Sequence, residues 1–138
     1  MSKITIVVHS GEFDKIMSAL IIGNGYLAMG DAVTLFFTFW GLRALMKNGL
    51  KRLPLSRMNL FGMGAWMMKR KMKRAGVAGP QRLFKDFREL GGRVIACEMT
   101  MDVMGISRSS MEHGLIDEYG AVGMFVLESR ESRSTLCI

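Results

Sequence analysis

Cysteine, histidine and proline are all scarce in this sequence of 138 residues, which holds two of each. Two cysteines far apart in a chain do not build a disulfide framework, so we expect free thiols and a reducing, cytoplasmic compartment. The histidines, His9 and His113, also lie far apart, and no CxxC or HExxH motif is present. We therefore expect no metal site.

Long uncharged apolar runs are missing as well. A membrane-spanning helix needs about 20 consecutive apolar residues. The most apolar stretch, residues 16–46, is divided by Asp31 and closed by Arg43. It therefore predicts a helix followed by a buried strand. The first residues also lack the charged start and apolar core of a secretory signal peptide.

Motifs for nucleotide or hydrolytic chemistry are absent. There is no Walker A motif, and the glycines of GNGYLAMG, residues 23–30, fall inside an expected helix. His9 and Ser10 adjoin each other, but no nucleophile elbow surrounds the serine. The residues thus indicate neither a nucleotide cofactor nor a serine hydrolase, and we expect no cofactor.

Short apolar strands alternate with helices along the chain. Residues 4–8, AVTLFFTF and RVIACEM read as strands that are apolar on both faces, and STLCI reads as a last strand. PQRLFKDFRELGG predicts an amphipathic helix with proline at its first position. Doubly apolar strands between helices predict a parallel sheet covered on both faces, in one α/β domain over residues 1–138.

Several boundaries are also predicted. The first helix is expected to start with Ser10 as its cap and to end near Gly30. Residues 48–80 read as a partly mobile, methionine-rich insertion that ends in a basic helix. A further helix is expected to begin within SRSSMEHGLI, and DEYGAVGMFVLESRES reads as another, with a short strand near residues 115–118.

The net charge is +7, and KRKMKR carries five cations in six residues. This run is either a solvated helix face or a docking surface for an anionic membrane or an acidic protein. Nucleic acid is the weakest alternative and is not expected, because no aromatic residues interleave with the charges. The neighbouring methionines pack or form an adaptable docking face; irregular spacing argues against Cu(I). The candidate docking residues are Lys69, Arg70, Lys71, Lys73 and Arg74.

Cys97 ends the third expected strand, and function in parallel sheets gathers beyond the carboxyl ends of strands. One interpretation is a buried thiol that fills a gap. The other is a partly exposed thiolate, favoured by a following helix and by Lys15 or His9, and opposed by Glu98 and Asp102 if they face it. No second cysteine is near in sequence, which disfavours a dithiol cycle; only Cys137 could serve in one.

Two longer motifs, FFTFWGLRAL at residues 36–45 and ACEMTMDVMGI at residues 96–106, resemble the DsrE/DsrF-like family. The similarity is greatest to the branch described as peroxiredoxin-like or as sulfurtransferases, although the peroxiredoxin cysteine motif is absent. SGEFDK and AMGDAVTLFF also fit that branch. The resemblance covers nearly the whole chain in order.

The resemblance implies a three-layer α/β/α fold with about five strands, and homo-oligomeric assembly. It implies a sulfur relay in which Cys97, in the third-strand motif, accepts sulfane sulfur as a persulfide and passes it on. The implied partners are rhodanese-like and TusA-like proteins, and some members associate with membranes. Whether the chain is an enzyme, a sulfurtransferase, or only a carrier stays open. The alternative is a non-catalytic scaffold that docks through its basic, methionine-rich insertion.

The neighbours of Cys97 receive roles by their positions. Gly11 permits a tight turn after the first strand. Lys15 either stabilises the thiolate or, like Asp14, contributes only to capping and dipole pairing at the start of the helix. Thr38 and Trp40 either wall the pocket or pack in the core. The candidate site-lining residues are therefore His9, Gly11, Asp14, Lys15, Thr38, Trp40 and Asp102, with Asp102 also a candidate helix cap.

Overall fold

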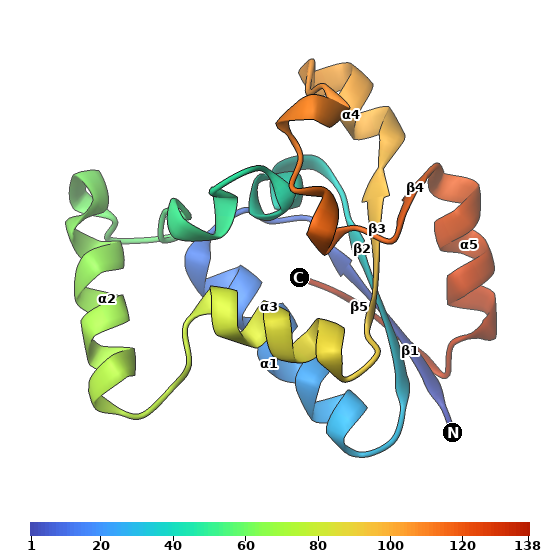
Figure 1. Cartoon of the computed structure of the whole chain (residues 1–138), viewed down its shortest axis with the longest axis horizontal. Helices are drawn as coiled ribbons and strands as arrows, with labels where there is room; N and C mark the ends of the chain where they lie inside the picture. Colours follow the sequence, from blue (N-terminus) through green and yellow to red (C-terminus); the bar gives the residue numbers. More distant parts are fainter.

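Five parallel strands form the centre of the computed structural model, which describes residues 1–138 (Figure 1). Their order across the sheet is β4-β3-β2-β1-β5, and every neighbouring pair is parallel. Helices lie on both faces, which confirms the predicted three-layer α/β/α fold. The strands are β1 (Lys3–Val8), β2 (Ala32–Phe37), β3 (Arg93–Cys97), β4 (Glu118–Gly120) and β5 (Ser134–Cys137).

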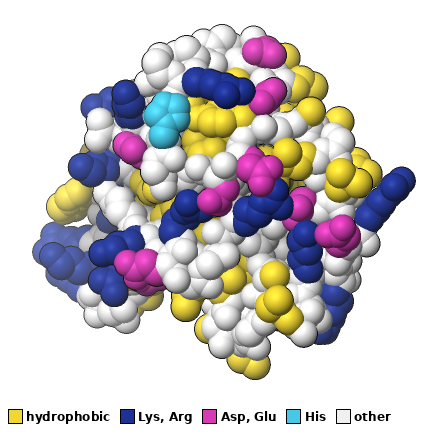
Figure 2. Space-filling view, turned by 45° about the vertical axis from the view of Figure 1, so that its right-hand side comes forward, with side chains coloured by type: hydrophobic (Ala, Val, Ile, Leu, Met, Phe, Trp, Pro, Cys, Tyr) yellow, Lys and Arg dark blue, Asp and Glu magenta, His cyan; other side chains and the backbone are white.

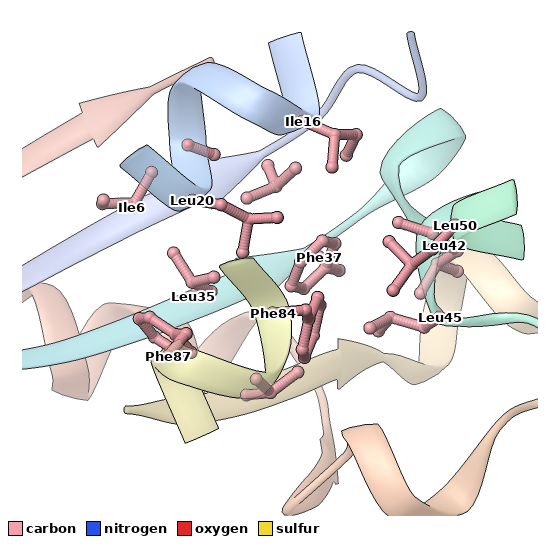
Figure 3. Packing of buried hydrophobic residues seen from close by; sticks show 14 of the residues in the cluster. Ile6, Ile16, Leu20, Leu35, Phe37, Leu42, Leu45, Leu50, Phe84 and Phe87 are labelled. Atoms are coloured by element: carbon pink, nitrogen blue, oxygen red, sulfur yellow. The ribbon is translucent and has the colours of Figure 1, made fainter. Parts of the chain in front are cut away.

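One face of the sheet is covered by α1 (Phe13–Ala28) and α3 (Pro80–Glu89), which pack against each other. Figure 3 shows Phe84 and Phe87 of α3 meeting strand residues such as Leu35 in one continuous core. Pro80 occupies the first turn of α3, as predicted. The expected Ser10 cap is wrong: the cap position of α1 is Glu12, and no side chain caps that end.

The opposite face is covered by α5 (Val122–Glu131). Phe36, Ile95 and Cys97 are buried there, and Met124 and Phe125 pack against them. Successive residues of a strand point to opposite faces, so Ala96 joins the α1 side while Cys97 joins the α5 side. The candidate thiol therefore belongs to the smaller of the two apolar layers.

Residues 39–74 lead away from the sheet. A 3₁₀ helix, η1 (Phe39–Leu45), packs into the core and is followed by the short turns η2 (Gly49–Lys51) and η3 (Leu60–Gly62). The predicted basic helix is α2 (Met63–Arg74), which stands apart at the left of Figure 1 and buries only Ala65. Its polar and apolar side chains are thus mostly open to solvent.

The helix expected within residues 107–116 is wrong. The chain there forms two short 3₁₀ turns, η4 (Arg108–Ser110) and η5 (His113–Leu115). Met111 bridges antiparallel to Met46, and the amides of Glu112 and Lys47 donate to carbonyls across the gap. The segment thus bonds to residues 45–47 and keeps only short 3₁₀ turns of its own. The preceding helix, α4 (Glu98–Met104), follows β3 directly.

No helix in this structure combines the length and apolar character that crossing a membrane would need.

Candidate functional site at the carboxyl edge of the sheet

The carboxyl ends of all strands meet at one edge, because every strand pair is parallel. His9 follows β1, Thr38 follows β2 and Cys97 ends β3, so three segments that the sequence singled out share this edge. α4 begins immediately after Cys97 and adds Thr100. In open α/β sheets, ligands and functional side chains commonly gather at this edge.

Cys97 is buried, with only 2% of its surface exposed. The partial exposure expected from a strand end is therefore wrong. Its sulfur lies on the α5 side, in the cluster of Phe36 and Ile95, against which Met124 and Phe125 pack. The rings of Phe36 and Phe125 lie 5.3 Å apart between centroids. The first turns of α5 thus form an apolar cover over the thiol.

Gly120 makes room for this cover. It is the register partner of Cys97 in β4, and an added Cβ would come within 2.6 Å of the sulfur of Met124. Any side chain at this position would have to displace Met124. The glycine therefore lets the methionine lie against the ends of β3 and β4.

Thr100 is fully buried and ties α4 to the end of β2. Its Oγ1 lies 3.0 Å from Oγ1 of Thr38 and accepts a hydrogen bond from the amide of Phe39 at 3.2 Å. Phe39 has a φ of 46°, in the left-handed region that non-glycine residues seldom adopt. The threonine pair thus fixes a strained turn beside the candidate thiol.

Two of the predicted site-lining residues are exposed to solvent. His9 is exposed, and its ring lies 5.3 Å from that of Phe39. Trp40 is 50% exposed, with the guanidinium of Arg43 at 5.3 Å from its ring centre. Gly11 is buried, and an added Cβ would come within 2.2 Å of the carbonyl oxygen of Trp40. Gly11 therefore brings the β1 and β2 ends together.

Asp14 and Lys15 lie on α1, which covers the face opposite to the thiol. Asp14 accepts hydrogen bonds from the amide and hydroxyl of Ser56, at 2.9 and 2.6 Å. Partial burial raises the pKa of Asp14, but the bonds from Ser56 outweigh it and hold the pKa below its ordinary value. No ion pair or hydrogen bond of the Lys15 side chain is seen, so nothing joins it to Cys97.

Asp102 is exposed on α4, away from the apolar cover. It lines a shallow cavity of about 230 Å³ together with Glu98 and Arg108. Arg108 donates to Glu98 at 3.0 Å, so one of the two acids beside Cys97 in sequence is paired with a cation. Asp102 caps no helix end by its side chain.

Cys137 ends the edge strand β5 and is exposed. β1 and β2 separate β5 from β3, so the two cysteines lie three strand spacings apart, about 14 Å. A disulfide needs Cα atoms within about 7 Å, which rules out an internal bond in this fold. A dithiol cycle inside one chain is thereby excluded.

The basic run lies on α2 and stays free of acids. None of its five cations forms an ion pair. The guanidinium of Arg70 lies 5.6 Å from the ring centre of Trp66, which is 60% exposed. Lys and Arg crowd the left margin of the face in Figure 2, whereas they alternate with Asp and Glu across its middle. No three His, Cys, Asp or Glu side chains come together as metal ligands do.

Three residues of the candidate site were not predicted from the sequence: Thr100, Met124 and Phe125. Thr100 is a buried polar residue between methionines, and that contrast was its one available signal. Met124 and Phe125 carried none, because they follow Cys97 by more than 25 residues and meet it only through the fold.

The chain is thus a three-layer α/β protein with one thiol, that of Cys97, at the carboxyl end of a central strand. The family model described as DsrE/DsrF/DrsH-like matches residues 1–51 and 44–137. The chain therefore belongs to the DsrE/DsrF/DrsH-like family, which confirms the resemblance of the motifs.

Two relatives match nearly end to end. The "Uncharacterized protein YrkE" of Bacillus subtilis is 35% identical over 97% of this chain and 95% of that protein. The "Sulfur carrier protein DsrE2" of Allochromatium vinosum is 30% identical over 99% of this chain and 98% of that protein.

Two solved structures share the fold over the full length of both chains. The ychN protein of E. coli superposes with a TM-score of 0.63 at 16% identity. MTH1491 of Methanobacterium thermoautotrophicum, a protein of unknown function, superposes with a TM-score of 0.64 at 12% identity. These likenesses support the three-layer architecture.

Proposed function

We propose that this chain is a sulfur-relay protein that carries sulfane sulfur as a persulfide on Cys97. The observation that carries the proposal is the position of Cys97 at the carboxyl end of β3, within a fold of the DsrE/DsrF/DrsH-like family. The relative named a sulfur carrier supports the sulfur-relay theme. A single thiol suits this task, because handing over a sulfur atom needs no resolving cysteine.

The transfer is a thiolate exchange. The Cys97 thiolate attacks the outer sulfur of a donor persulfide, one S–S bond forms, and the electron pair of the broken S–S bond leaves on the donor thiolate. In the second step the thiolate of an acceptor attacks the outer sulfur on Cys97, and Cys97 leaves as thiolate. No net oxidation occurs in either step, so neither a metal nor an outside oxidant enters.

Access is the physical obstacle to this chemistry. Cys97 is 2% exposed, so a donor sulfur reaches it only when Met124 and Phe125 move away. α5 is suited to such movement, because Val122, Val126 and Leu127 on it are exposed and contribute little packing. Sulfur transfer is therefore coupled to opening of the first turns of α5.

Donor and acceptor dock at the carboxyl edge in this proposal. Exposed Trp40 and His9 follow the ends of β2 and β1 at this edge and offer contact surface there. The partners we propose are proteins with accessible thiols, of the rhodanese-like and TusA-like kinds. Thr38 and Gly11 hold this part of the carboxyl edge in place. We also propose that several copies of this chain assemble into a homo-oligomer.

Polysulfide loading followed by intact-mass measurement tests the proposal. Wild-type protein is expected to gain sulfur atoms that a reductant removes. The Cys137→Ser variant should still gain one sulfur on the peptide that contains Cys97, and the double variant with Cys97→Ser should gain none. Equal loading of the single and double variants would show that Cys97 is not the carrier.

A second candidate function, a non-catalytic scaffold, is favoured by the surface of α2. Apolar side chains that are more than half exposed surround its first turns, next to five unpaired cations. Such a surface suits docking on an acidic protein or on the rim of an anionic membrane. The exposed residues are Met58, Leu60, Phe61, Met63 and Trp66.

Salt-dependent binding separates this candidate from the first. Replacing Lys71 and Arg74 by Glu should abolish binding to vesicles with anionic lipids, or to an acidic partner, and leave sulfur loading of Cys97 unchanged. Vesicle flotation at low and high salt measures the first effect. Binding that survives both charge reversal and high salt would contradict the scaffold function.

A further inference from the structure

Positive charge is concentrated in one part of the chain. Residues 32–85 contain twelve of the 19 lysines and arginines and no aspartate or glutamate. The other residues therefore hold seven cations and all twelve acids. Within this stretch only Arg82 and Lys85 form ion pairs, with the acids Asp86 and Glu89 that follow it. The remaining cations have no carboxylate partner, so an anion from outside would be attracted to them.

Two adjoining cavities lie within this part. The first has a volume of about 310 Å³ and lies between α2 and the beginning of α3. Its wall carries Lys51, Lys69 and Lys73, and no acid lines it. The second, of about 400 Å³, shares Lys51 and Lys69 with the first and is also free of acids.

Three lysines line the first cavity, and contacts fix the ammonium of one of them, Lys69. Lys69 and Lys73 are four residues apart on α2, which places them on one side of the helix. The ammonium of Lys69 donates to the carbonyl of Lys51 at 3.3 Å and lies 5.5 Å from the ring centre of Phe13. None of the three forms an ion pair. Three lysines thus line one cavity that has no acid in its wall.

We propose that this cavity binds a phosphate-bearing ligand through Lys51, Lys69 and Lys73. Lysine ammonium groups bind phosphate oxygens as compact charges with charge-assisted hydrogen bonds. The volume matches that of small-ligand pockets, which begin at about 300 Å³. The site lies on the α1–α3 side of the molecule and is independent of Cys97, so it stands or fails separately from sulfur transfer.

Calorimetric titration of the full chain with pyrophosphate, at constant ionic strength, tests the site. Wild type should show saturable binding, and Lys69→Gln should weaken it by about tenfold or more. Lys47→Gln is the matched control: it removes the same charge at an exposed lysine of the same acid-free stretch, outside both cavities, and should change the affinity less than about twofold. Cys97→Ser should leave the affinity unchanged.

A second arm uses vesicles that contain phosphatidic acid, because a lipid headgroup offers the same phosphate chemistry. Lys69-dependent binding of pyrophosphate supports a soluble ligand, and Lys69-dependent binding of the vesicles alone supports a headgroup. Equal losses in Lys69→Gln and Lys47→Gln would overturn the proposal, since diffuse attraction would then explain the binding. Absence of saturable binding in both arms would overturn it as well.

Discussion

Cys97 and Gly120 are register partners at the ends of β3 and β4, and the glycine leaves the space that Met124 fills. This relationship explains how a cysteine at the carboxyl edge of the sheet is nevertheless buried. A larger residue at position 120 would push Met124 aside, and the thiol would lose its cover. The burial of Cys97 is therefore a property of the β4–α5 connection and not of β3.

Shortening the cover should expose the thiol. Met124→Ala is expected to raise the alkylation rate of Cys97 severalfold, because the loss of the long side chain opens a path through the apolar cluster. Mass spectrometry of the peptide with Cys97, after timed exposure to iodoacetamide, measures the rate. Val126→Ala on the same helix, at a residue 40% exposed, should leave the rate near that of wild type. Equal acceleration in both variants would indicate general loosening of α5 instead.

The two thiols should stay unlinked under oxidation. With two strands between β3 and β5, mild treatment with diamide is expected to yield no internal disulfide in the folded chain. Cys137 is exposed and should react first, giving mixed or intermolecular disulfides. Non-reducing peptide mapping distinguishes these products. An internal Cys97–Cys137 link formed without denaturant would contradict the strand order described above.

Thr100→Val should lower the free energy of unfolding by about 1–3 kcal/mol. The substitution keeps the shape but leaves the buried amide of Phe39 without its acceptor and Thr38 without its hydroxyl partner. Urea denaturation gives the value. Thr135→Val, at an exposed threonine of β5, also removes a hydroxyl contact and should cost less than about 1 kcal/mol. A similar cost for both would show that the Thr100 bonds carry no special weight.

Glu128 makes stability depend on pH. It is 8% exposed, accepts from Lys3 at 2.8 Å and from Thr34 at 3.0 Å, and pairs with Arg93. Burial raises the pKa of Glu128, but the bonds from Lys3 and Thr34 and the charge of Arg93 outweigh it, so the pKa lies below the ordinary 4.5. A lowered pKa contributes stability that is fully present above pH 4.5 and is lost as the pH falls through the folded-state value.

Glu128→Gln should therefore cost about 2 kcal/mol at pH 7, and the difference from wild type should shrink steadily below pH 4.5. Glu131→Gln is the control, because Glu131 contacts the same Lys3 at 3.1 Å but is 72% exposed. Its cost should stay under about 1 kcal/mol. Urea denaturation between pH 3 and pH 7 measures both variants. A cost for Glu128→Gln that persists unchanged at the acid end would contradict the role of its ionisation.

The central strands and α3 could be predicted from sequence because their patterns are local. β1, β2 and β3 are apolar on both faces, and α3 combines an initial proline with an apolar stripe. The segment at residues 107–116 could not be predicted, because its backbone pairs with residues 45–47 and keeps only short 3₁₀ turns of its own. Its serines favour the start of a helix, but the pairing with residues 45–47 determines the backbone conformation.

The candidate site was predictable only in part. Parallel strands place His9, Thr38 and Cys97 at one edge, and sequence order alone implies this. Which face Cys97 takes, and which residues cover it, depends on the α5 crossover from β4 to β5. For the same reason Lys15 was assigned to the thiol, although α1 packs on the other face.

Sulfur relay through Cys97 can be followed with a labelled sulfur atom. The Cys137→Ser variant is loaded with ³⁵S-polysulfide, freed of excess reagent, and mixed with a TusA-like acceptor that carries an accessible cysteine. We expect the label to leave this chain and to appear on the acceptor as a reductant-labile persulfide, and we expect Cys97→Ser in the same background to transfer none. Label transfer that persists without Cys97, or a loaded Cys97 that gives up no sulfur to any thiol acceptor, would contradict sulfur relay through Cys97.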